Sequence, residues 1–283
     1  MKFGMIFANV GAFVEPEAAA GLGNLAEEVG LESLWTVEHV LVPTDYAPEY
    51  PYSKTGKMPG GEDAPIPDPL IWLTFVAAHT ERVRLATGIL ILPQRNPIVL
   101  AKEVATLDVL SHGRVTLGIG VGWLREEFDA LGVPFEERGR RTDDHVAALR
   151  ALWSGASVDF HGEFTSFTGG NSFPQPVQPG GIPIVVGGHT EAAAKRAGRI
   201  GDGFFPGKGD PSHLIAVMRA TAIEYGRDPD AIEITRGGAL DLEGVKKLAD
   251  EGVDRIAIPP MGFDLATLRE NLSRFADDVI AKS

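Results

Sequence analysis

The sequence contains no cysteine among its 283 residues. This absence excludes disulfide bonds, thiolate nucleophiles, iron–sulfur clusters and zinc sites built on thiolates. The chain also lacks the His-x-His and His-Glu-x-x-His patterns and any run of carboxylates with metal-ligand spacing, so we predict no metal site and no metal hydrolase. Neither the Gly-x-Ser-x-Gly elbow nor the Ser-x-x-Lys nucleophile pattern occurs. The sequence therefore points away from the common metal-dependent and covalent hydrolases.

Positive charge is scarce. Lysine and arginine together number 26, against 39 aspartates and glutamates, which gives a formal net charge of -13 at pH 7. Nucleic-acid binding depends on clustered basic side chains that contact phosphates. We therefore expect no nucleic-acid partner, although a small phosphorylated ligand held by local groups remains compatible with this charge.

A secretory signal is also lacking. The N-terminal sequence MKFGMIFANVGAF is apolar, but it has no cationic run, no long apolar core and no convincing cleavage site. We interpret it as a β-strand. The protein is therefore expected in the cytoplasm, with no membrane partner.

Apolar residues are present in the amount that a globular core requires. The chain is 44% hydrophobic and 23% charged, which is ordinary for a folded protein. No linker rich in proline, serine or glycine separates two halves of different composition, so we predict one domain over residues 1–283. A single barrel of roughly 250 residues fits this length.

Residues 84–128 carry the clearest structural pattern, which is a strand, a helix and a second strand. Residues 85–92 are almost all apolar and suited to β-structure, as in a parallel strand that is covered on both faces. Pro97 fits the first position of a helix, and the second strand, residues 115–119, runs into a glycine-rich segment. This is one βαβ unit, and the same alternation continues along the chain.

Eight strand-like runs alternate with helices over the whole sequence, which predicts a (β/α)8 TIM barrel. The predicted strands are residues 2–9, 33–37, 85–92, 115–119, 184–186, 202–205, 232–236 and 255–258. Residues 158–167 alternate in the manner of a small hairpin inserted between strands four and five. A doubly wound sheet is the weaker alternative, because it needs no eighth strand and usually has a glycine-rich fingerprint after strand one, where this chain reads Asn-Val-Gly-Ala.

The active site of such a barrel lies at the C-terminal ends of its strands. Strand two ends at Glu38 and His39, which point to opposite sides of an extended chain, so only one can face the barrel mouth. The following loop, residues 40–67, holds six prolines and three of the four tyrosines, and such long loops are more often functional than not. We predict that His39 is catalytic and Glu38 supports it; the alternative is a histidine that only props the loop.

The ends of strands three, four and five supply the other candidates, which are Thr87, Gly88, Gly120, Gly122, Trp123, Gly187, Gly188, His189 and Thr190. After strand five, two glycines precede a hydroxyl residue at a helix start, where backbone N–H groups and the helix dipole favour an anion. A tight turn with an ordinary N-cap is the alternative. For Trp123, the two alternatives are a core residue and a cofactor contact.

The remaining titratable groups are expected to be solvated. The histidines concerned are His79, His112, His145, His161 and His213, and the carboxylates are Glu126, Glu127, Glu136 and Glu137 on charged helix faces. An anion site and an apolar mouth with few titratable groups suit a cofactor that brings its own chemistry.

Three segments together resemble a known family. They are Glu38-His39, residues 87–132 with TGILILPQRNP and GIGVGWLREEF, and residues 187–206 with GGHTEAAAKRAGRIGDGFFP. The chain is similar over nearly its whole length to the luciferase-like monooxygenase superfamily of flavin and deazaflavin oxidoreductases. VGWLREEF followed by PFEERGRR is most similar to the branch that depends on coenzyme F-420, an 8-hydroxy-5-deazaflavin.

The resemblance implies a deazaflavin or FMN in the barrel mouth. It implies a phosphate near residues 188–190 and a ring backed by the bulged end of strand three at Gly88 and Ile89, which a non-prolyl cis peptide often joins in the family. The acidic chain does not favour the anionic polyglutamate tail of the deazaflavin, although four basic side chains can compensate locally: Arg95, Arg125, Lys195 and Lys208.

The expected function is hydride transfer between coenzyme F-420 and a small organic substrate that the sequence does not identify. The alternatives are an FMN-dependent monooxygenase that uses reduced flavin and oxygen, supplied by a separate cofactor reductase, and a flavin-binding barrel without catalysis. We also expect a homodimer, because family members usually pair and the helices after strands two and three carry more apolar residues than one buried stripe needs.

Overall fold

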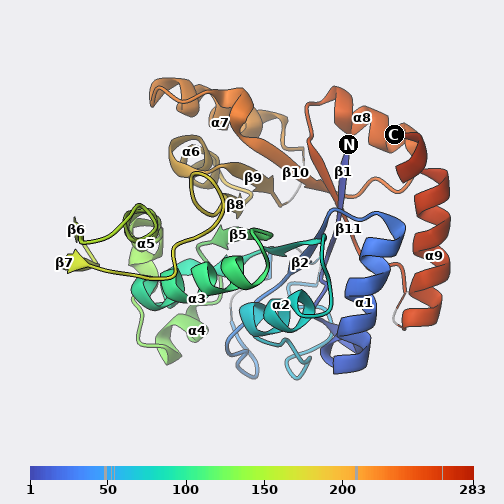
Figure 1. Cartoon of the computed structure of the whole chain (residues 1–283), viewed down its shortest axis with the longest axis horizontal. Helices are drawn as coiled ribbons and strands as arrows, with labels where there is room; N and C mark the ends of the chain where they lie inside the picture. The colour runs from blue at the N-terminus through green and yellow to red at the C-terminus, as the bar shows by residue number, and fades with distance from the viewer. Residues whose placement is uncertain (48–49, 52, 54, 208–209, 263) are drawn as a thin grey trace.

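The computed structural model describes residues 1–47, 50–51, 53, 55–207, 210–262 and 264–283. Its main sheet has the strand order β3-β2-β1-β11-β10-β9-β8-β5-β4, and an additional pairing of β3 with β5 closes it (Figure 1). All of these pairings are parallel. Because β3 and β4 are two parts of one barrel position, the nine segments make eight positions. The predicted (β/α)8 barrel is confirmed.

The barrel strands have these bounds: β1 (Lys2–Ile6), β2 (Ser33–Thr36), β3 (Arg84–Thr87), β4 (Leu90–Ile91), β5 (Val115–Gly120), β8 (Ile184–Gly188), β9 (Gly203–Pro206), β10 (Glu233–Gly237) and β11 (Arg255–Ile258). The helices are α1 (Pro16–Val29), α2 (Pro69–Ala77), α3 (Pro97–Leu110), α4 (Arg125–Ala130), α5 (Arg138–Leu152), α6 (Glu191–Ile200), α7 (Ser212–Glu224), α8 (Leu242–Asp250) and α9 (Leu265–Asp278). In the described part of the chain, no helix has the length and apolarity needed to cross a membrane.

Local sequence signals fix the helix starts. Proline occupies the first position of α1, α2 and α3, where its missing N–H has no intrahelical partner to lose. Side chains of Asp68 and Asn96 accept hydrogen bonds from the first-turn N–H groups of α2 and α3, and Thr190, Asp241 and Asp264 cap α6, α8 and α9 in the same way. Proline or a capping side chain therefore marks the start of each of these helices.

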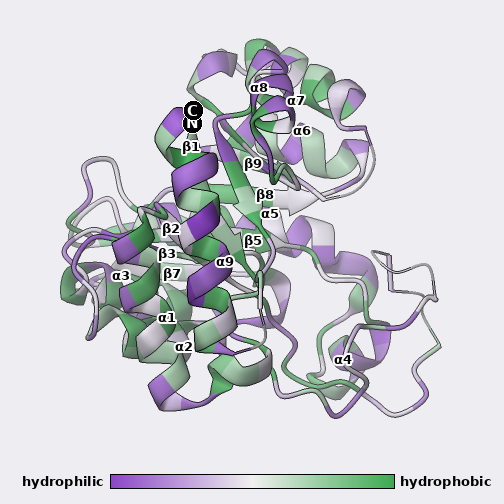
Figure 2. Ribbon diagram, turned by 90° about the vertical axis from the view of Figure 1, so that its right-hand side faces the viewer, coloured by the Kyte–Doolittle hydropathy of each residue, from purple (hydrophilic) through white to green (hydrophobic). Residues whose placement is uncertain are grey.

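Apolar side chains fill the space between the strands and the surrounding helices. In Figure 2 the barrel strands are mostly green, whereas the outward side of α9 is largely purple. This layer holds nearly all of the buried apolar side chains, including Leu22, Leu34, Leu73, Leu100 and Phe204. Burial of this apolar surface is the main force that wraps the helices around the barrel.

The interior of the barrel is plugged below the mouth. Trp35 is fully buried there and packs with Ala86 and Val185, and its ring meets Phe205 edge-on at 5.6 Å between centroids. Beneath it, the Arg255 guanidinium lies 5.5 Å from the Trp35 ring. In the described part of the chain, these side chains close the barrel interior to a ligand from the N-terminal ends of the strands.

Strand three differs from the prediction of one continuous strand over residues 85–92. β3 ends at Thr87, a cis peptide joins Gly88 to Ile89, β4 resumes at Leu90, and a 3-10 turn follows at Leu92–Gln94. The chain keeps its place in the sheet because the Gly88 N–H donates to the Thr36 carbonyl (2.6 Å). The expected cis peptide is confirmed, and the apolar pattern alone did not reveal the break.

Two strands lie outside the barrel, between α5 and β8. β6 (Val158–His161) and β7 (Ser166–Gly170) pair antiparallel and project to one side of the molecule (Figure 1). They leave the order of the barrel strands unchanged.

Candidate functional site

The end of β2 presents Glu38 and His39 in opposite directions, as the alternation of an extended chain predicts. Glu38 is buried, and it accepts hydrogen bonds from the Ile91 N–H and from Arg95 (Nε at 3.0 Å). His39 instead packs edge-on against Trp123, with 5.7 Å between ring centroids. Of the two side chains, only His39 lies on the side of the aromatic loop residues at the mouth.

His39 is held by a buried carboxylate. Its Nδ1 lies 3.1 Å from Glu127 Oε2, and the side chains of His39 and Glu127 are 9% and 0% exposed. The other carboxylate oxygen, Oε1, accepts the N–H groups of Val40 (2.6 Å) and Leu41 (3.1 Å). Glu127 thus ties α4 to both the histidine and the first residues of the long loop.

The prediction that Glu127 lies on a solvated helix face is wrong. α4 has six residues, which are too few for periodicity to show which face is buried. Burial alone would raise the pKa of Glu127, but the hydrogen bond and charge of His39, together with Gln94 and the Leu41 N–H, hold it below its usual value. Glu127 is therefore a buried anion beside His39.

Asn9 fixes the backbone just before this pair. It is fully buried after β1; its Oδ1 accepts the Val37 N–H (2.8 Å), and its Nδ2 donates to the carbonyls of Val37 (2.9 Å) and Pro67 (3.1 Å). Asn9 therefore links the exit of strand two to the exit of strand one and to the last residue of the long loop. Sequence reasoning missed Asn9, because a lone asparagine at a strand end has no distinguishing pattern.

Glu38 belongs to an ion cluster on the outer side of the mouth. Arg95 pairs with Glu38 and, at 2.8 Å, with Asp68, which also caps α2. Burial raises the pKa of Glu38, and the Arg95 guanidinium opposes this shift. The two carboxylates in turn raise the pKa of Arg95 against the effect of its own burial. This cluster joins β2, the turn after β4 and the start of α2. Glu38 therefore lies where it can support the strand-two exit.

The basic side chains considered for a polyglutamate tail are largely engaged. Arg95 is enclosed by its two carboxylates, Arg125 pairs with Glu136 at 2.7 Å, and Lys195 pairs with Glu191 at 3.7 Å. Lys208 lies outside the described residues. Of these side chains, Arg125 and Lys195 could therefore bind the tail only by exchanging their present partners.

Aromatic side chains from the long loop pack on Trp123, the ring that contacts His39. Trp123 meets Tyr46 and Tyr50 edge-on, with centroids 5.5 and 5.3 Å apart, in addition to its contact with His39. Trp123 precedes α4 and is half-buried. Residues 48, 49, 52 and 54 of the loop lie outside the description. The loop and the strand-four exit thus meet over the histidine.

Glycines at the mouth make room for Ile89. A Cβ at Gly120 would lie 2.5 Å from Ile89 Cδ1, and a Cβ at Gly187 would lie 2.6 Å from Ile89 Cγ2. The side chain of Ile89 therefore lies between the strand-four and strand-five exits. Thr87 is buried and its hydroxyl donates to the Gly118 carbonyl (2.6 Å), so this side chain serves the sheet.

Gly122 and Gly188 shape the two exits. Gly122 has φ +78°, and a Cβ there would lie 2.7 Å from the Phe128 ring. Gly188 has φ +144°, and its Cβ would lie 2.7 Å from the Ala193 methyl group. Both positions require glycine for conformation and for space.

The strand-five exit leads into the N-terminus of α6. Thr190 Oγ1 accepts the Ala193 N–H (3.2 Å), which confirms the expected N-cap. His189 lies between Gly188 and this cap and is half-buried. The N-terminus of the ten-residue helix α6 thus lies beside Gly188, a position that has no side chain. Free first-turn N–H groups and the helix dipole make this a suitable place for a phosphate.

His145 contradicts the prediction that it is solvated. It is 3% exposed, its Nδ1 faces the Leu92 carbonyl at 3.3 Å, and burial lowers its pKa. The reason is that α5 packs against the 3-10 turn after β4. The other histidines that were expected to be solvated, His79, His112, His161 and His213, are exposed.

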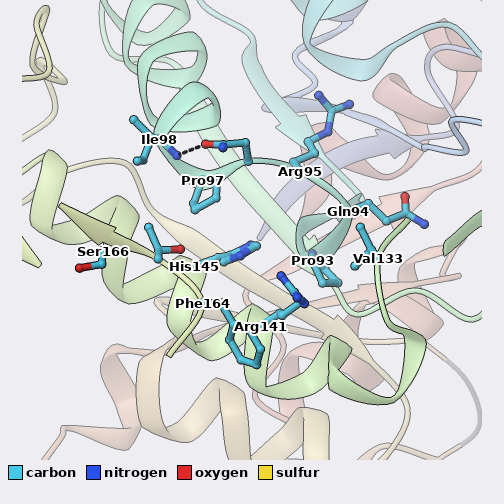
Figure 3. Close-up of a pocket in the computed structure, with 12 residues that line it drawn as sticks. Pro93, Gln94, Arg95, Pro97, Ile98, Val133, Arg141, His145, Phe164 and Ser166 are labelled. Atoms are coloured by element: carbon cyan, nitrogen blue, oxygen red, sulfur yellow. Dashed lines mark hydrogen bonds between the residues drawn. The ribbon is translucent and has the colours of Figure 1, made fainter. Parts of the chain in front are cut away.

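His145 borders a cavity of about 330 Å³ beneath the hairpin (Figure 3). Its wall includes Pro93, Gln94, Arg141 and Phe164. The cavity lies on the outer side of the barrel, between α5 and the start of α3, and His39 and Gly188 do not line it. Among the residues that the structure describes, no group of three or more histidines and carboxylates could hold a metal ion.

Comparisons with known proteins agree with this architecture. The profile of the family described as luciferase-like monooxygenase matches residues 1–240. The uncharacterized protein Rv0940c of Mycobacterium tuberculosis is 35% identical over 273 residues, which cover 92% of this chain and 94% of the relative. The F420-dependent glucose-6-phosphate dehydrogenase of Kineococcus radiotolerans is 36% identical over 215 residues, which cover 75% of this chain and 58% of the relative.

Similarity also extends to solved structures. The monooxygenase RslO1 from Streptomyces bottropensis has a TM-score of 0.75 at 26% sequence identity, and the match covers 100% of this chain and 99% of that chain. The sequence and structural likenesses both include the strand exits that carry His39, Gly120 and Gly188.

Proposed function

Since the chain belongs to the luciferase-like monooxygenase family, we propose that it is an oxidoreductase that transfers a hydride between coenzyme F-420 and a small organic substrate. The observation that carries this proposal is His39, a histidine held at the mouth of a barrel whose lower interior is plugged. The relative described as F420-dependent supports the choice of cofactor. We also propose that the protein acts in the cytoplasm.

The described residues fit a flavin-like cofactor. Gly188 and the start of α6 would hold its phosphate, because Gly188 places no side chain of its own at the helix N-terminus. Ile89 would support the ring, because Gly120 and Gly187 leave room for its side chain between the two strand exits. The full set that we assign to cofactor binding is His39, Thr87, Gly88, Ile89, Gly120, Gly122, Trp123, Gly187, Gly188, His189 and Thr190, with Thr87 acting through its backbone position.

The bound cofactor supplies the hydride chemistry, and the chain supplies a proton and a dry site. Hydride transfer to an acceptor such as a carbonyl needs a proton on the neighbouring atom. Histidine can deliver it near neutral pH without a metal. Trp123 packs on His39, whose side chain is 9% exposed, and this exclusion of water strengthens the interaction of His39 with developing charge.

Cofactor titration tests the proposal. We expect the purified protein to bind the oxidised deazaflavin more tightly than FMN, and to show the absorbance of a deazaflavin when it is produced in a host that makes both. Reduced cofactor should then be oxidised by a panel of organic acceptors in single turnovers. Binding of neither cofactor would refute the proposal, whereas binding without turnover of any acceptor would support a barrel without catalysis.

The second candidate is an FMN-dependent monooxygenase. The likeness to monooxygenase RslO1 at 26% identity over the whole chain favours it specifically. Such an enzyme would take reduced flavin from a separate reductase and would consume oxygen. Tighter binding of FMN, with oxygen uptake that depends on reduced FMN and substrate, would establish this candidate in place of the first.

A further inference from the structure

We infer that Glu127 is the positioning residue of this site and that it fixes the tautomer of His39. Nδ1 of the ring is thereby committed to Glu127, and Nε2 becomes the nitrogen that exchanges a proton at the mouth. The catalytic meaning of this inference rests on the proposed function. The tautomer itself can be tested without any cofactor or substrate.

The argument begins with the hydrogen-bonding capacity of a carboxylate, which only accepts when ionised. Glu127 Oε2 lies 3.1 Å from His39 Nδ1, so the nitrogen must carry the hydrogen. A neutral imidazole has one protonated nitrogen, so Nε2 holds a lone pair. In the charged form, Nε2 also carries a proton and can donate it.

Glu127 is itself immobile, which makes it an effective orienting group. Its Oε1 is occupied by the N–H groups of Val40 and Leu41, so the carboxylate cannot rotate away from His39 without breaking both bonds. The side chain is completely buried, so water cannot replace the histidine as its partner. The lowered pKa of Glu127 is consistent with a carboxylate that stays ionised.

Glu126 offers a matched control because it tethers the same loop without touching the histidine. Its Oε1 accepts the Ala47 N–H at 3.0 Å. The exchange Glu126→Gln removes a neighbouring charge and alters one hydrogen bond to the same loop. Any effect that belongs to the tautomer of His39 should therefore be specific to position 127.

The substitution Glu127→Gln makes a sharp prediction. The amide oxygen is expected to retain the two backbone N–H groups, because the amide nitrogen cannot accept them. The amide NH2 then faces His39 Nδ1 and can only donate. The ring must respond by inverting its tautomer, with the hydrogen moving to Nε2.

Nuclear magnetic resonance of ring-15N-labelled histidine measures this directly in the cofactor-free protein. His39→Asn identifies the signals of His39 among the seven histidines. We expect the neutral wild-type ring to be protonated at Nδ1, the Glu127→Gln ring at Nε2 and the Glu126→Gln ring at Nδ1. A wild-type ring protonated at Nε2 would overturn the inference even if the variant does not fold, and so would a folded Glu127→Gln protein with the wild-type tautomer.

Kinetics then separates a positioning role from a structural one. We expect Glu127→Gln to lower the single-turnover rate by roughly a hundredfold or more while cofactor affinity changes less than threefold, as for other wrong-tautomer variants. Glu126→Gln should stay within about threefold of wild type. An unchanged rate with an inverted tautomer would refute the catalytic role, whereas a protein that binds neither cofactor would refute the proposed function and leave the tautomer result standing.

Discussion

At the scale of single residues, the first prediction concerns His39. Replacing it with asparagine keeps a polar side chain of similar reach but removes the group that can transfer a proton near neutral pH. His39→Asn should slow single-turnover oxidation of the reduced cofactor by roughly a hundredfold or more. Cofactor affinity, measured by titration, should be nearly unchanged. A variant with the wild-type rate and pH profile would show that His39 only supports the loop.

Gly188 gives the second residue-scale prediction. Gly188→Leu should weaken cofactor binding at least tenfold, because the new Cβ meets Ala193 at 2.7 Å and would occupy the approach to the α6 N-terminus. Gly226→Leu is the control, since it also has a positive φ but nothing within 4 Å, and it lies in the turn after α7, far from the mouth. Equal affinities of the two variants and wild type would remove the phosphate assignment.

The single residues also show how far sequence reasoning reaches. The positions of His39, Gly188 and Thr190 could be predicted because each lies at or just after the C-terminal end of a barrel strand. Glu127 and His145 could not, because their burial depends on how α4 and α5 pack against segments distant in the sequence. A charged residue in a short helix looks solvated until its neighbours are known.

At the scale of secondary-structure elements, the Glu38–Arg95–Asp68 cluster joins β2, the turn after β4 and the start of α2. Arg95→Met should lower the free energy of unfolding by about 3–5 kcal/mol, because it leaves a buried carboxylate without its partner. Arg274→Met, which breaks an exposed pair with Glu270, should cost about 1 kcal/mol or less. Urea unfolding measures both. Equal losses would mean that the cluster does not join the elements as described.

The order of the elements was predictable, whereas their interruptions were not. Eight apolar runs separated by amphipathic helices leave few arrangements other than a closed parallel barrel. The break between β3 and β4 has no such signature, because Gly88 and Ile89 sit in a continuous apolar run. The run shows which residues are buried but not which neighbours they are buried against.

At the scale of the whole molecule, α2 and α3 present an apolar surface that the monomer leaves uncovered. Its large side chains include Ile71, Val99 and Leu110, which are 74%, 54% and 62% exposed. These helices lie side by side on one flank of the barrel (Figure 1). Patches of this kind mark sites of association in soluble proteins.

We therefore predict a homodimer that pairs through α2 and α3. Light scattering at micromolar concentration should give twice the mass of 30.2 kDa for the wild type, and Ile71→Lys should shift it toward the monomer. Ile223→Lys, an equally exposed change on α7, should leave the dimer intact. A monomeric wild type, or a dimer that only Ile223→Lys disrupts, would contradict this interface.

The plug formed by Trp35 and Arg255 also constrains kinetics. A barrel that is closed at one end has a single opening. A cofactor and a substrate that react inside it therefore cannot bind and leave independently. The molecule that occupies the deeper position has to bind first and leave last. For the proposed reaction we therefore expect ordered binding and release, which initial-rate and product-inhibition patterns would test.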